Sequence, residues 1–319
     1  MQSLTPIFST YISSDDIIVL AISGGVDSMV LLDLVLDSHN RANIIVAHLD
    51  HSLRGAESNG DRELVASICK RENIVFEVEK LDIASMAKNE KSSLEAIARR
   101  ERYNFLESVR VKHNSRYILT AHHLVDQTET IIGNIVKGGK VRGLSGMSVI
   151  SGYIFRPLLT FTKANILEYA HKKSIEYRED STNKDTIYDR NRIRHDIIPV
   201  IESLNPNIHN TFKELALYMQ SLGDFLTYTV EDWLHKNELE SGKPNTFLSI
   251  SFLSLSLFFQ AEIISYLYVR AQGGSSQGLS RGLIDELIRF IGDPGSYGKK
   301  EIKKLKLERR GERILFIFY

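Results

Sequence analysis

The stretch IIVLAISGGVDSMVLLDLVL, residues 17–36, decides the fold of this chain. Its apolar run at 17–22 predicts a buried strand, and the pattern at 28–38 predicts a helix with an apolar face. Gly24 and Gly25 separate the two segments. A strand, a glycine loop and a helix form a phosphate-binding arrangement, because loop N–H groups point inward and the helix N-terminus is partly positive. A plain helix cap, with Ser23 and Asp27 as N-terminal residues, is the alternative.

The same alternation of apolar runs and helical patterns continues along the chain. It predicts an α/β fold with a doubly wound, mostly parallel sheet, because parallel strands buried on both faces are continuously apolar. Further strands are predicted at 44–49, 74–81 and 117–122, and helices at 57–73, 93–113 and 125–136.

The Asn205-Pro206 turn signal places a domain boundary near residue 208. We predict an N-terminal catalytic domain at 1–208 and a smaller C-terminal α+β domain at 209–319, which begins with one long helix over 212–234. The uncharged segment 246–261 is shorter than the about 20 residues that a membrane span needs. It predicts a buried strand-like piece that leads into a core helix, and we expect no membrane partner.

Composition narrows the class of protein. The chain has 40 basic and 40 acidic residues, so any basic surface for a nucleic acid must be local. The single cysteine, Cys69, excludes a disulfide framework and a Cys-rich metal cluster within one chain. The N-terminus does not resemble a signal peptide, and together these features favour a cytoplasmic protein.

The loop itself excludes two common nucleotide motifs. It has no lysine as a Walker A loop would, and it lacks the G-x-G-x-x-G of dinucleotide sites. The sequence SGGVDS instead resembles the loop of the ATP pyrophosphatases, which transfer AMP from ATP to an oxygen. The resemblance implies that ATP binds here, with the β- and γ-phosphates on the loop and Mg²⁺ on Asp27. The residues that match position by position are Ser23, Gly24, Gly25, Val26, Asp27 and Ser28.

A wider set of motifs resembles the tRNA(Ile)-lysidine synthetases over about residues 17–210. It comprises HLDHSLRGAES (48–58), ARRERYNFL (98–106), TAHHLVDQTET (120–130), GGKVRGLSGM (138–147), RPLL (156–159) and the segment 179–206. The resemblance implies that ATP adenylates the C2 oxygen of the wobble cytidine in the isoleucine tRNA with anticodon CAU. The ε-amine of free L-lysine then displaces AMP and forms lysidine. Two steps replace a displacement for which the ring oxygen alone is a poor leaving group.

Asp126 and Glu129 are the residues that we expect to handle the amine. They are three apart on a predicted helix, so both carboxylates face one side. They could bind the substrate lysine, bind the metal or take a proton, and the alternative is solvent-facing helix charge. His122 and Asp126 also have the spacing of a zinc pair, but a hydrogen-bonding role for His122 is favoured.

Basic and polar residues complete the predicted site. The run Arg190, Arg192, Arg194 and His195 indicates contacts to phosphates of ATP or RNA, against a solvated helix start as the alternative. Arg99 has the same interpretation, together with Arg102, and His48 and His51 lie at the edge where such sheets bind ligands. Asp180 and Asn183 would brace a loop or bind lysine. The catalytic set is therefore Asp27, Asp126, Glu129 and Arg192.

The C-terminal stretch from Lys299 is the densest basic cluster. It predicts two strands joined near Arg310-Gly311, with Lys304, Lys306 and Glu308 on one strand face. We expect Lys304 and Lys306 to contact tRNA, and the alternative is an edge strand protected against aggregation. A homodimer is also a prediction.

Three other classes remain as alternatives. A tRNA thiolase on the same fold would need cysteines, and this chain has one. A non-catalytic RNA-binding protein would not need the intact loop and acidic residues, and an ATP-dependent amide ligase would not need the basic tail.

Overall fold

The computed structural model describes residues 8, 10–52, 56–178, 189–242, 245–276, 278–293 and 298–319. The chain divides into two compact units, Met1–Met219 and Gln220–Tyr319. The division falls inside the long helix α11 (Ile208–Ser241), whereas the sequence predicts a boundary after residue 208, at the start of that helix.

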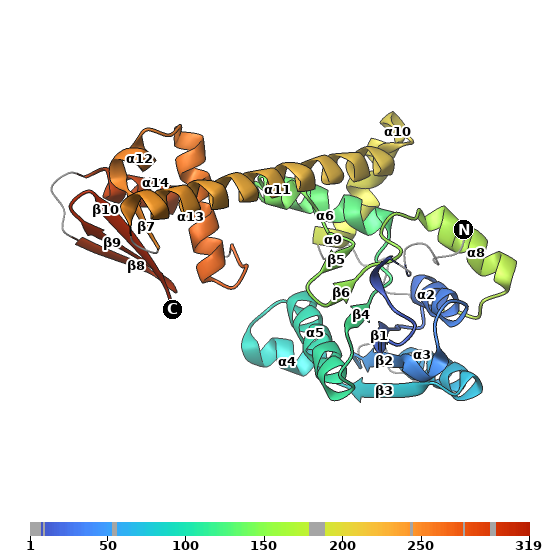
Figure 1. The fold of residues 1–319 in the computed structure, drawn as a ribbon. Helices are drawn as coiled ribbons and strands as arrows, with labels where there is room; N and C mark the ends of the chain where they lie inside the picture. The colour runs from blue at the N-terminus through green and yellow to red at the C-terminus, as the bar shows by residue number, and fades with distance from the viewer. Residues whose placement is uncertain are drawn as a thin grey trace. The chain divides into compact units, whose positions relative to one another are not determined.

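The first unit alternates strands and helices, as predicted (Figure 1). Its strands are β1 (Ile18–Ala21), β2 (Ile44–Asp50), β3 (Val75–Lys80), β4 (Tyr117–Leu119), β5 (Ile150–Ser151) and β6 (Ile154–Phe155). Its helices before α11 are α2 (Val26–Leu36), α3 (Ala56–Glu72), α4 (Ile83–Glu90), α5 (Leu94–Lys112), α6 (Leu124–Val136), α7 (Val141–Leu144), α8 (Lys163–Lys173), α9 (Asp189–Arg192) and α10 (Ile198–Leu204), with the short η1 (Arg41–Asn43) and the π-helical segment η3 (Ile193–Ile197).

The six strands form one sheet in the order β3-β2-β1-β4-β6-β5. Every neighbouring pair is parallel except β5 and β6, which form a short antiparallel edge. The predicted doubly wound, mostly parallel sheet is therefore confirmed.

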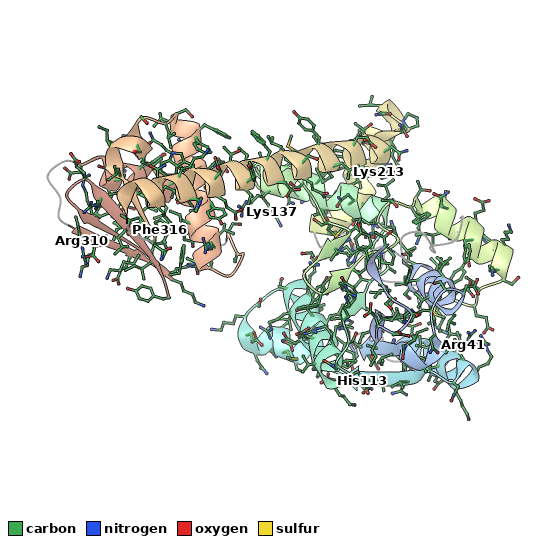
Figure 2. All side chains as sticks on the ribbon, in the orientation of Figure 1. Arg41, His113, Lys137, Lys213, Arg310 and Phe316 are labelled. Atoms are coloured by element: carbon green, nitrogen blue, oxygen red, sulfur yellow. The ribbon has the colours of Figure 1, made fainter. Side chains whose placement is uncertain are left out.

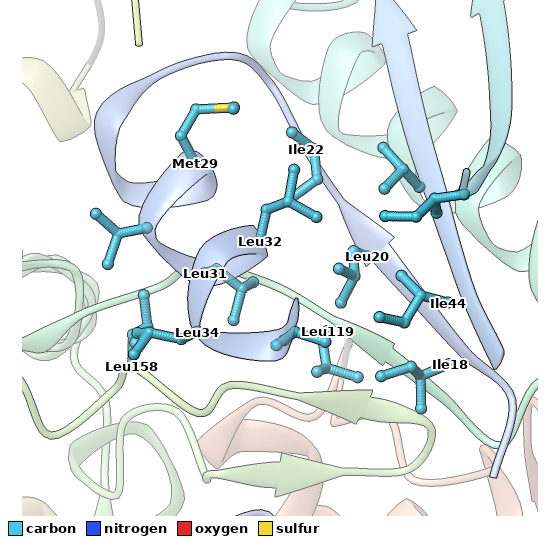
Figure 3. Close-up of a cluster of buried hydrophobic side chains, with 14 of the residues drawn as sticks. Ile18, Leu20, Ile22, Met29, Leu31, Leu32, Leu34, Ile44, Leu119 and Leu158 are labelled. Atoms are coloured by element: carbon cyan, nitrogen blue, oxygen red, sulfur yellow. The ribbon is translucent and has the colours of Figure 1, made fainter. Parts of the chain in front are cut away.

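Helices cover both faces of this sheet because alternate residues of the central strand point to opposite sides. Ile18 and Leu20 pack with residues of α2, α3 and α8. Figure 3 shows both side chains in the cluster that includes Leu31 and Leu32 of α2. Val19 packs against α5, with Phe105 and Val109. All three β1 side chains are fully buried. Full burial of a side chain of this size stabilises the fold by roughly 1.5–3 kcal/mol, which explains why this strand is continuously apolar.

Strand order fixes where a ligand can bind. From β1 the chain builds outward through β2 to β3, and it then returns to place β4 on the other side of β1. The crevice between the carboxyl ends of β1 and β4 is thus a topological switch point, where open α/β sheets bind ligands. The SGGVDS loop follows β1, and the TAHH segment follows β4.

The second unit is a small α+β structure. Strands β7 (Thr246–Leu248), β8 (Gly298–Ile302), β9 (Leu305–Arg310) and β10 (Arg313–Phe318) form an antiparallel sheet in the order β7-β10-β9-β8. Helices α12 (Ser249–Leu253), α13 (Leu257–Ala271) and α14 (Arg281–Gly292) supply much of its core. Residues 246–261 are a buried strand that leads into helices, as predicted, and no helix of the described residues is long and apolar enough to cross a membrane.

The basic tail forms the two predicted strands, β9 and β10, with Arg310 and Phe316 on this sheet (Figure 2). The predicted common face is confirmed for Lys306 and Glu308, which are two apart on β9. It is wrong for Lys304, which lies in the turn between β8 and β9. Lys306 is largely covered and lies 3.8 Å from Glu301 and 3.7 Å from Glu308. Arg309 is buried and donates to the carbonyl of Ile291 at the end of α14. Much of this positive charge is therefore engaged within the unit.

Candidate active site

The loop after β1 directs its backbone amides onto one side chain. The amides of Ser23 and Gly24 both donate to Ser28 Oγ at 3.2 Å, and Ser28 Oγ donates to the carbonyl of Gly25 at 2.8 Å. Gly24 has a φ of +95°, which favours glycine. Converging amides at a helix N-terminus are suited to an anion, so phosphate oxygens can take the place of the serine hydroxyl as acceptors.

Asp61 and Arg178 contact the glycine loop and hold Gly24 in position. A Cβ on Gly24 would lie 3.4 Å from the Cβ of Asp61 on α3. Arg178 donates its backbone N–H to the Gly24 carbonyl at 3.0 Å, and its Nε lies 3.0 Å from Asp61 Oδ1. A side chain at Gly24 would thus be strained and in contact with α3. Asp61 and Arg178 are positioning residues that sequence reasoning missed.

His48 braces the end of β1. Its Nδ1 lies 2.9 Å from the carbonyl oxygen of Ile22, and because that oxygen can only accept, Nδ1 carries the proton. Burial lowers the pKa of His48, although the hydrogen bond to Ile22 opposes the shift. His48 is therefore a neutral ring next to the loop, with Nε2 as an acceptor, and its predicted contact to ATP stays a prediction.

Asp27 lies between two positively polarised groups from distant segments. Lys163, the first residue of α8, places its Nζ 2.6 Å from Asp27 Oδ1 across a separation of 136 residues. His123 Nε2 lies 3.7 Å from Asp27 Oδ2. The His123 ring also caps α6, because its Nδ1 accepts from the N–H of Val125 at 3.2 Å. Sequence reasoning chose His122 and missed both His123 and Lys163.

The acidic pair on α6 is buried against two arginines. Arg190 Nη2 lies 2.6 Å from Asp126 Oδ1, and Arg190 Nε lies 2.6 Å from Glu129 Oε2. Arg194 Nε donates to Glu129 Oε1, and its Nη2 lies 3.4 Å from Asp126. The predicted common face of Asp126 and Glu129 is confirmed, because both accept from the same guanidinium groups.

The surrounding charges keep Asp126 ionised. Burial acts to raise the pKa of Asp126, but His123, Arg190 and His122, with a hydrogen bond from the His123 amide, outweigh it and hold the pKa below its usual range. For Arg190, burial alone would lower the pKa, and Asp126 and Glu129 raise it overall. The Asp126 carboxylate can therefore accept from a cationic or polar ligand.

More basic residues surround the pair. Burial lowers the pKa of His122 to about 4, assisted by Arg156, Arg190 and Arg99 and opposed by Asp126. Its Nδ1 lies 2.8 Å from Thr120 Oγ1, and His122 precedes α6 rather than lying within it. His122 and Asp126 are thus not a pair on one helix, as the predicted zinc spacing requires. Among the described residues, no group of three or more metal-ligating side chains occurs. Neutral His122 serves hydrogen bonding, as predicted.

Arginines from α5 extend this region. Arg102 Nη2 lies 3.1 Å from Nε2 of His51, which joins the segment after β2 to α5. Arg99 lies over the ring of Tyr103, with 5.2 Å from its Cζ to the ring centroid. Arg156 is buried and donates to the carbonyl of Ser148 at 2.9 Å. This set forms a basic border to the acidic pair, which suits a polyanionic ligand.

Other predicted residues lie elsewhere. Arg192 is exposed and lies 4.0 Å from Asp196 on its own helix turn, so the structure does not bring it to Asp126 or Glu129. His195 is also exposed. Asp180 and Asn183 fall outside the described residues. Lys304 and Lys306 belong to the second unit.

The residues at the loop fit a magnesium ion held together with phosphates. Mg²⁺ in nucleotide sites takes one or two carboxylates, substrate phosphate oxygens and waters. Asp27 offers a partly exposed carboxylate in the first turn of α2, directly after the phosphate-binding loop. One carboxylate beside a phosphate cradle meets that requirement.

Fold and loop together define a nucleotide-binding α/β protein with its site at the switch point of a doubly wound sheet. The profile of the PP-loop domain family matches residues 2–201, and the chain belongs to this family.

Similar proteins agree with this assignment. The chain is 32% identical over 314 residues to the tRNA(Ile)-lysidine synthase of Bacillus subtilis, and the match covers 94% of this chain and 65% of that protein. It is 36% identical to the bifunctional protein TilS/HprT of Listeria monocytogenes, covering 96% of this chain and 48% of that one. The chain thus spans less than two thirds of the length of these relatives. Among solved structures, the U34-tRNA thiolase NcsA of Methanococcus maripaludis has a similar fold, with a TM-score of 0.52 and 16% identity over 66% of this chain and 73% of that one.

Proposed function

We propose that the chain is a tRNA(Ile)-lysidine synthase, which uses ATP to join free lysine to the wobble cytidine of the isoleucine tRNA with anticodon CAU. The observation that carries the proposal is the buried pair Asp126 and Glu129, bordered by arginines and placed beside the phosphate-binding loop through His123. Similarity to tRNA(Ile)-lysidine synthases over 94% of the chain supports it.

In the first step the loop holds the β- and γ-phosphates of ATP. The C2 oxygen of cytidine forms a bond to the α-phosphorus, and the bond from that phosphorus to the bridging oxygen breaks. The electron pair stays on pyrophosphate. The amides of Ser23 and Gly24 and the Ser28 hydroxyl are placed to stabilise the leaving phosphates. Mg²⁺ held by Asp27 would neutralise part of the phosphate charge when bound.

In the second step the lysine amine must lose its proton. An amine with a pKa of about 10.4 is protonated at pH 7, and its neutral form costs roughly 4.6 kcal/mol there. Asp126 and Glu129 are placed to bind the ammonium form. One of these two carboxylates takes the proton, and the neutral nitrogen then attacks C2 with its lone pair. The bond from C2 to the AMP oxygen then breaks, and AMP leaves with the electron pair.

The arginines give this step an order. Arg190 and Arg194 bind both carboxylates, so a lysine ammonium must compete with them. RNA phosphates near the basic border would draw guanidinium groups away from the pair, since phosphate also accepts two N–H bonds from an arginine. The proposal therefore has lysine binding favoured once the RNA is in place.

A reaction on ATP, free lysine and tRNA belongs in the cytoplasm.

The thiolase alternative has little support in the residues. The similar solved thiolase carries a [4Fe-4S] cluster, whereas this chain has one cysteine, Cys69. That cysteine is buried, and burial raises the pKa of its thiol to about 11. A protonated, isolated thiol is neither a cluster ligand nor a nucleophile at neutral pH.

AMP release tests the proposed class directly. The chain is incubated with Mg-ATP and with each combination of total tRNA and lysine. We expect sustained AMP release with both present and no lysine turnover without RNA. AMP release with lysine and no RNA would indicate an amide ligase, and absence of AMP release under every condition would indicate a non-catalytic RNA-binding protein.

A further inference from the structure

We propose that Lys163 is a catalytic residue whose ammonium group binds the β- and γ-phosphates as pyrophosphate leaves. The inference rests on the proposed adenylation and assigns to α8 a charge that the loop itself lacks.

The need for such a charge follows from the sequence around the loop. The first 40 residues contain neither lysine nor arginine, so the strand, the loop and α2 bring no permanent cation to a ligand with several negative charges. Amides and a hydroxyl supply partial charges only. In loops of the Walker A type a lysine within the motif fills this role. Here any cationic side chain must come from another segment.

Lys163 is at the required place. Its Nζ lies 2.6 Å from Oδ1 of Asp27, which is the second residue of α2 and directly follows the glycine loop. Lys163 is the first residue of α8, and Thr162 caps that helix by accepting from the Asn165 N–H at 3.1 Å. The cap fixes the start of the helix and hence the origin of the lysine side chain. An ammonium has three N–H donors, and the contact to Asp27 uses one.

Other contacts already hold α8 against α2, so Lys163 is not needed to join the two helices. Tyr169 Oη donates to Asp33 Oδ2 at 2.9 Å, and Lys173 Nζ lies 3.0 Å from Asp37 Oδ2. Ile166 and Ala170 on α8 are buried in the core that includes α2. Lys163 and Asp27 form the contact between α8 and α2 that lies nearest the glycine loop. Their side chains are partly exposed, with exposed fractions of 38% and 30%. They are accessible to a ligand.

The chemistry places the benefit in the transition state. As the bond from the α-phosphorus to the bridging oxygen breaks, negative charge grows on pyrophosphate, and a preorganised ammonium stabilises that charge more than it stabilises bound ATP. Loss of one such donor costs about 100- to 1,000-fold in kcat. An arginine in place of Lys163 keeps the positive charge but changes its position and geometry. Lys163→Arg should therefore retain part of the rate that a neutral side chain loses.

The test compares Lys163→Met and Lys163→Arg with Lys173→Met, a matched control that removes the other lysine–aspartate pair between the same helices. Adenylation is followed as pyrophosphate release with tRNA and lysine, and Mg-pyrophosphate binding is followed by calorimetry without RNA. Lys163→Met should lower kcat about 100-fold or more with little change in KM for ATP, and should weaken pyrophosphate binding at least about 10-fold. Lys173→Met should match the wild type in both, and Lys163→Arg should fall between.

Two results separate the two proposals. Wild-type pyrophosphate affinity in Lys163→Met would overturn the role of Lys163, whatever the tRNA assay gives. If the wild type releases no AMP with any RNA but binds pyrophosphate through Lys163, the proposed function fails and the phosphate contact stands. Equal loss of folding stability and activity in Lys163→Met, with unchanged pyrophosphate affinity per folded molecule, would assign Lys163 a structural role and contradict the proposal.

Discussion

Asp27 is positioned by groups that come from three places in the chain. Its own backbone belongs to the first turn of α2, while Lys163 begins α8 and His123 caps α6. Each partner is the first residue or the cap of a helix, so side chains from the N-terminal ends of three helices meet at Asp27. Such convergence concentrates positive potential where phosphates would bind. Removal of the carboxylate should therefore affect chemistry more than folding.

Asp27→Asn should lose AMP transfer by about 100-fold or more, because the amide cannot hold Mg²⁺ against the leaving phosphates. AMP release at saturating ATP is the measurement, with circular dichroism to establish that the fold persists. Asp37→Asn on the same helix, which removes the aspartate paired with Lys173, is the control and should retain the wild-type rate. Near-normal turnover of Asp27→Asn at ordinary Mg²⁺ would remove Asp27 from the catalytic set.

His122 should make the stability of the chain depend on pH. Its pKa is lowered to about 4 in the folded state, chiefly by burial. Between about pH 6.5 and pH 4 the unfolded chain binds a proton that the folded chain does not, so stability falls as the pH falls through this window. In His122→Asn, the free energy of unfolding should fall by roughly 2–3 kcal/mol less between pH 7 and pH 4.5 than it does in the wild type. Urea unfolding at pH 7 and pH 4.5 measures it, and parallel losses in both proteins would show that His122 is not the group responsible.

At the scale of elements, the decisive feature is how α6 presents two carboxylates three residues apart. His123 and Asp126 form a reciprocal cap, in which the Asp126 carboxylate accepts from the His123 amide at 2.8 Å. This cap fixes the first turn of the helix, so Glu129 follows on the same face and reaches Arg190 and Arg194. The fixed start of α6 thus orients both the loop-facing histidine and the acidic pair.

Amide variants of the pair should separate the two chemical steps. If Asp126 and Glu129 handle the lysine amine, Asp126→Asn and Glu129→Gln should still adenylate tRNA and then stall. Adenylated tRNA, trapped from ATP labelled at the α-phosphate, should accumulate in both. Glu107→Gln on α5, a partly exposed residue paired with Arg110, is the control. Loss of adenylation in both α6 variants would instead assign the pair to ATP or metal binding.

The elements around the site could largely be predicted, because their patterns are local. The β1 strand, the loop and α2 follow from a continuous apolar run, two glycines and a helical pattern within 20 residues. The two-residue strands β5 and β6 and the four-residue helices α7 and α9 are shorter than any period that a pattern could reveal. The eight-residue helix α4 was also missed, although its Asp82 cap is a recognisable start signal.

The site was predicted only where its residues are close in sequence. Asp126 and Glu129 could be paired from helical spacing, whereas Lys163 meets Asp27 across 136 residues, and no local pattern encodes that contact. The cap signal of a histidine three residues before an aspartate could have identified His123. The sequence does not show which arginine of the run 190–194 faces Asp126 and Glu129, so Arg192 is predicted as catalytic. In the structure, α9 and η3 direct Arg192 toward Asp196 instead.

At the scale of the whole molecule, binding a polyanion requires local positive charge, since the net charge is zero. The first unit offers the basic border around the acidic pair. In the second unit, Lys304 is exposed, and Arg310 is exposed although its Nη2 lies 2.8 Å from Glu308 Oε1. Lys306 and Arg309 are largely covered and engaged with carboxylates or carbonyls. We therefore expect the tail to add a modest share of RNA affinity. A homodimer also stays a prediction, which sedimentation of the free protein checks.

A double variant, Lys304→Ala with Arg310→Ala, should weaken tRNA binding and flatten its salt dependence. Two lost phosphate contacts should lower the slope of log affinity against log salt by about 1–2 units. Filter binding over a salt series is the measurement, and ATP affinity should not change. Lys236→Ala on α11, which removes an exposed lysine paired with Asp232, is the control. An unchanged slope in the double variant would show that this stretch only protects a sheet edge.

Transfer of labelled lysine into RNA distinguishes a tRNA(Ile)-lysidine synthase from every alternative. The chain is incubated with Mg-ATP, labelled free lysine and total tRNA, and the RNA is digested to nucleosides. We expect the label to enter one modified cytidine, to require ATP for entry, and to be lost when the CAU-anticodon isoleucine tRNA is removed from the pool. Label that stays in free lysine while ATP is cleaved, or that enters RNA without ATP, would contradict the proposed function.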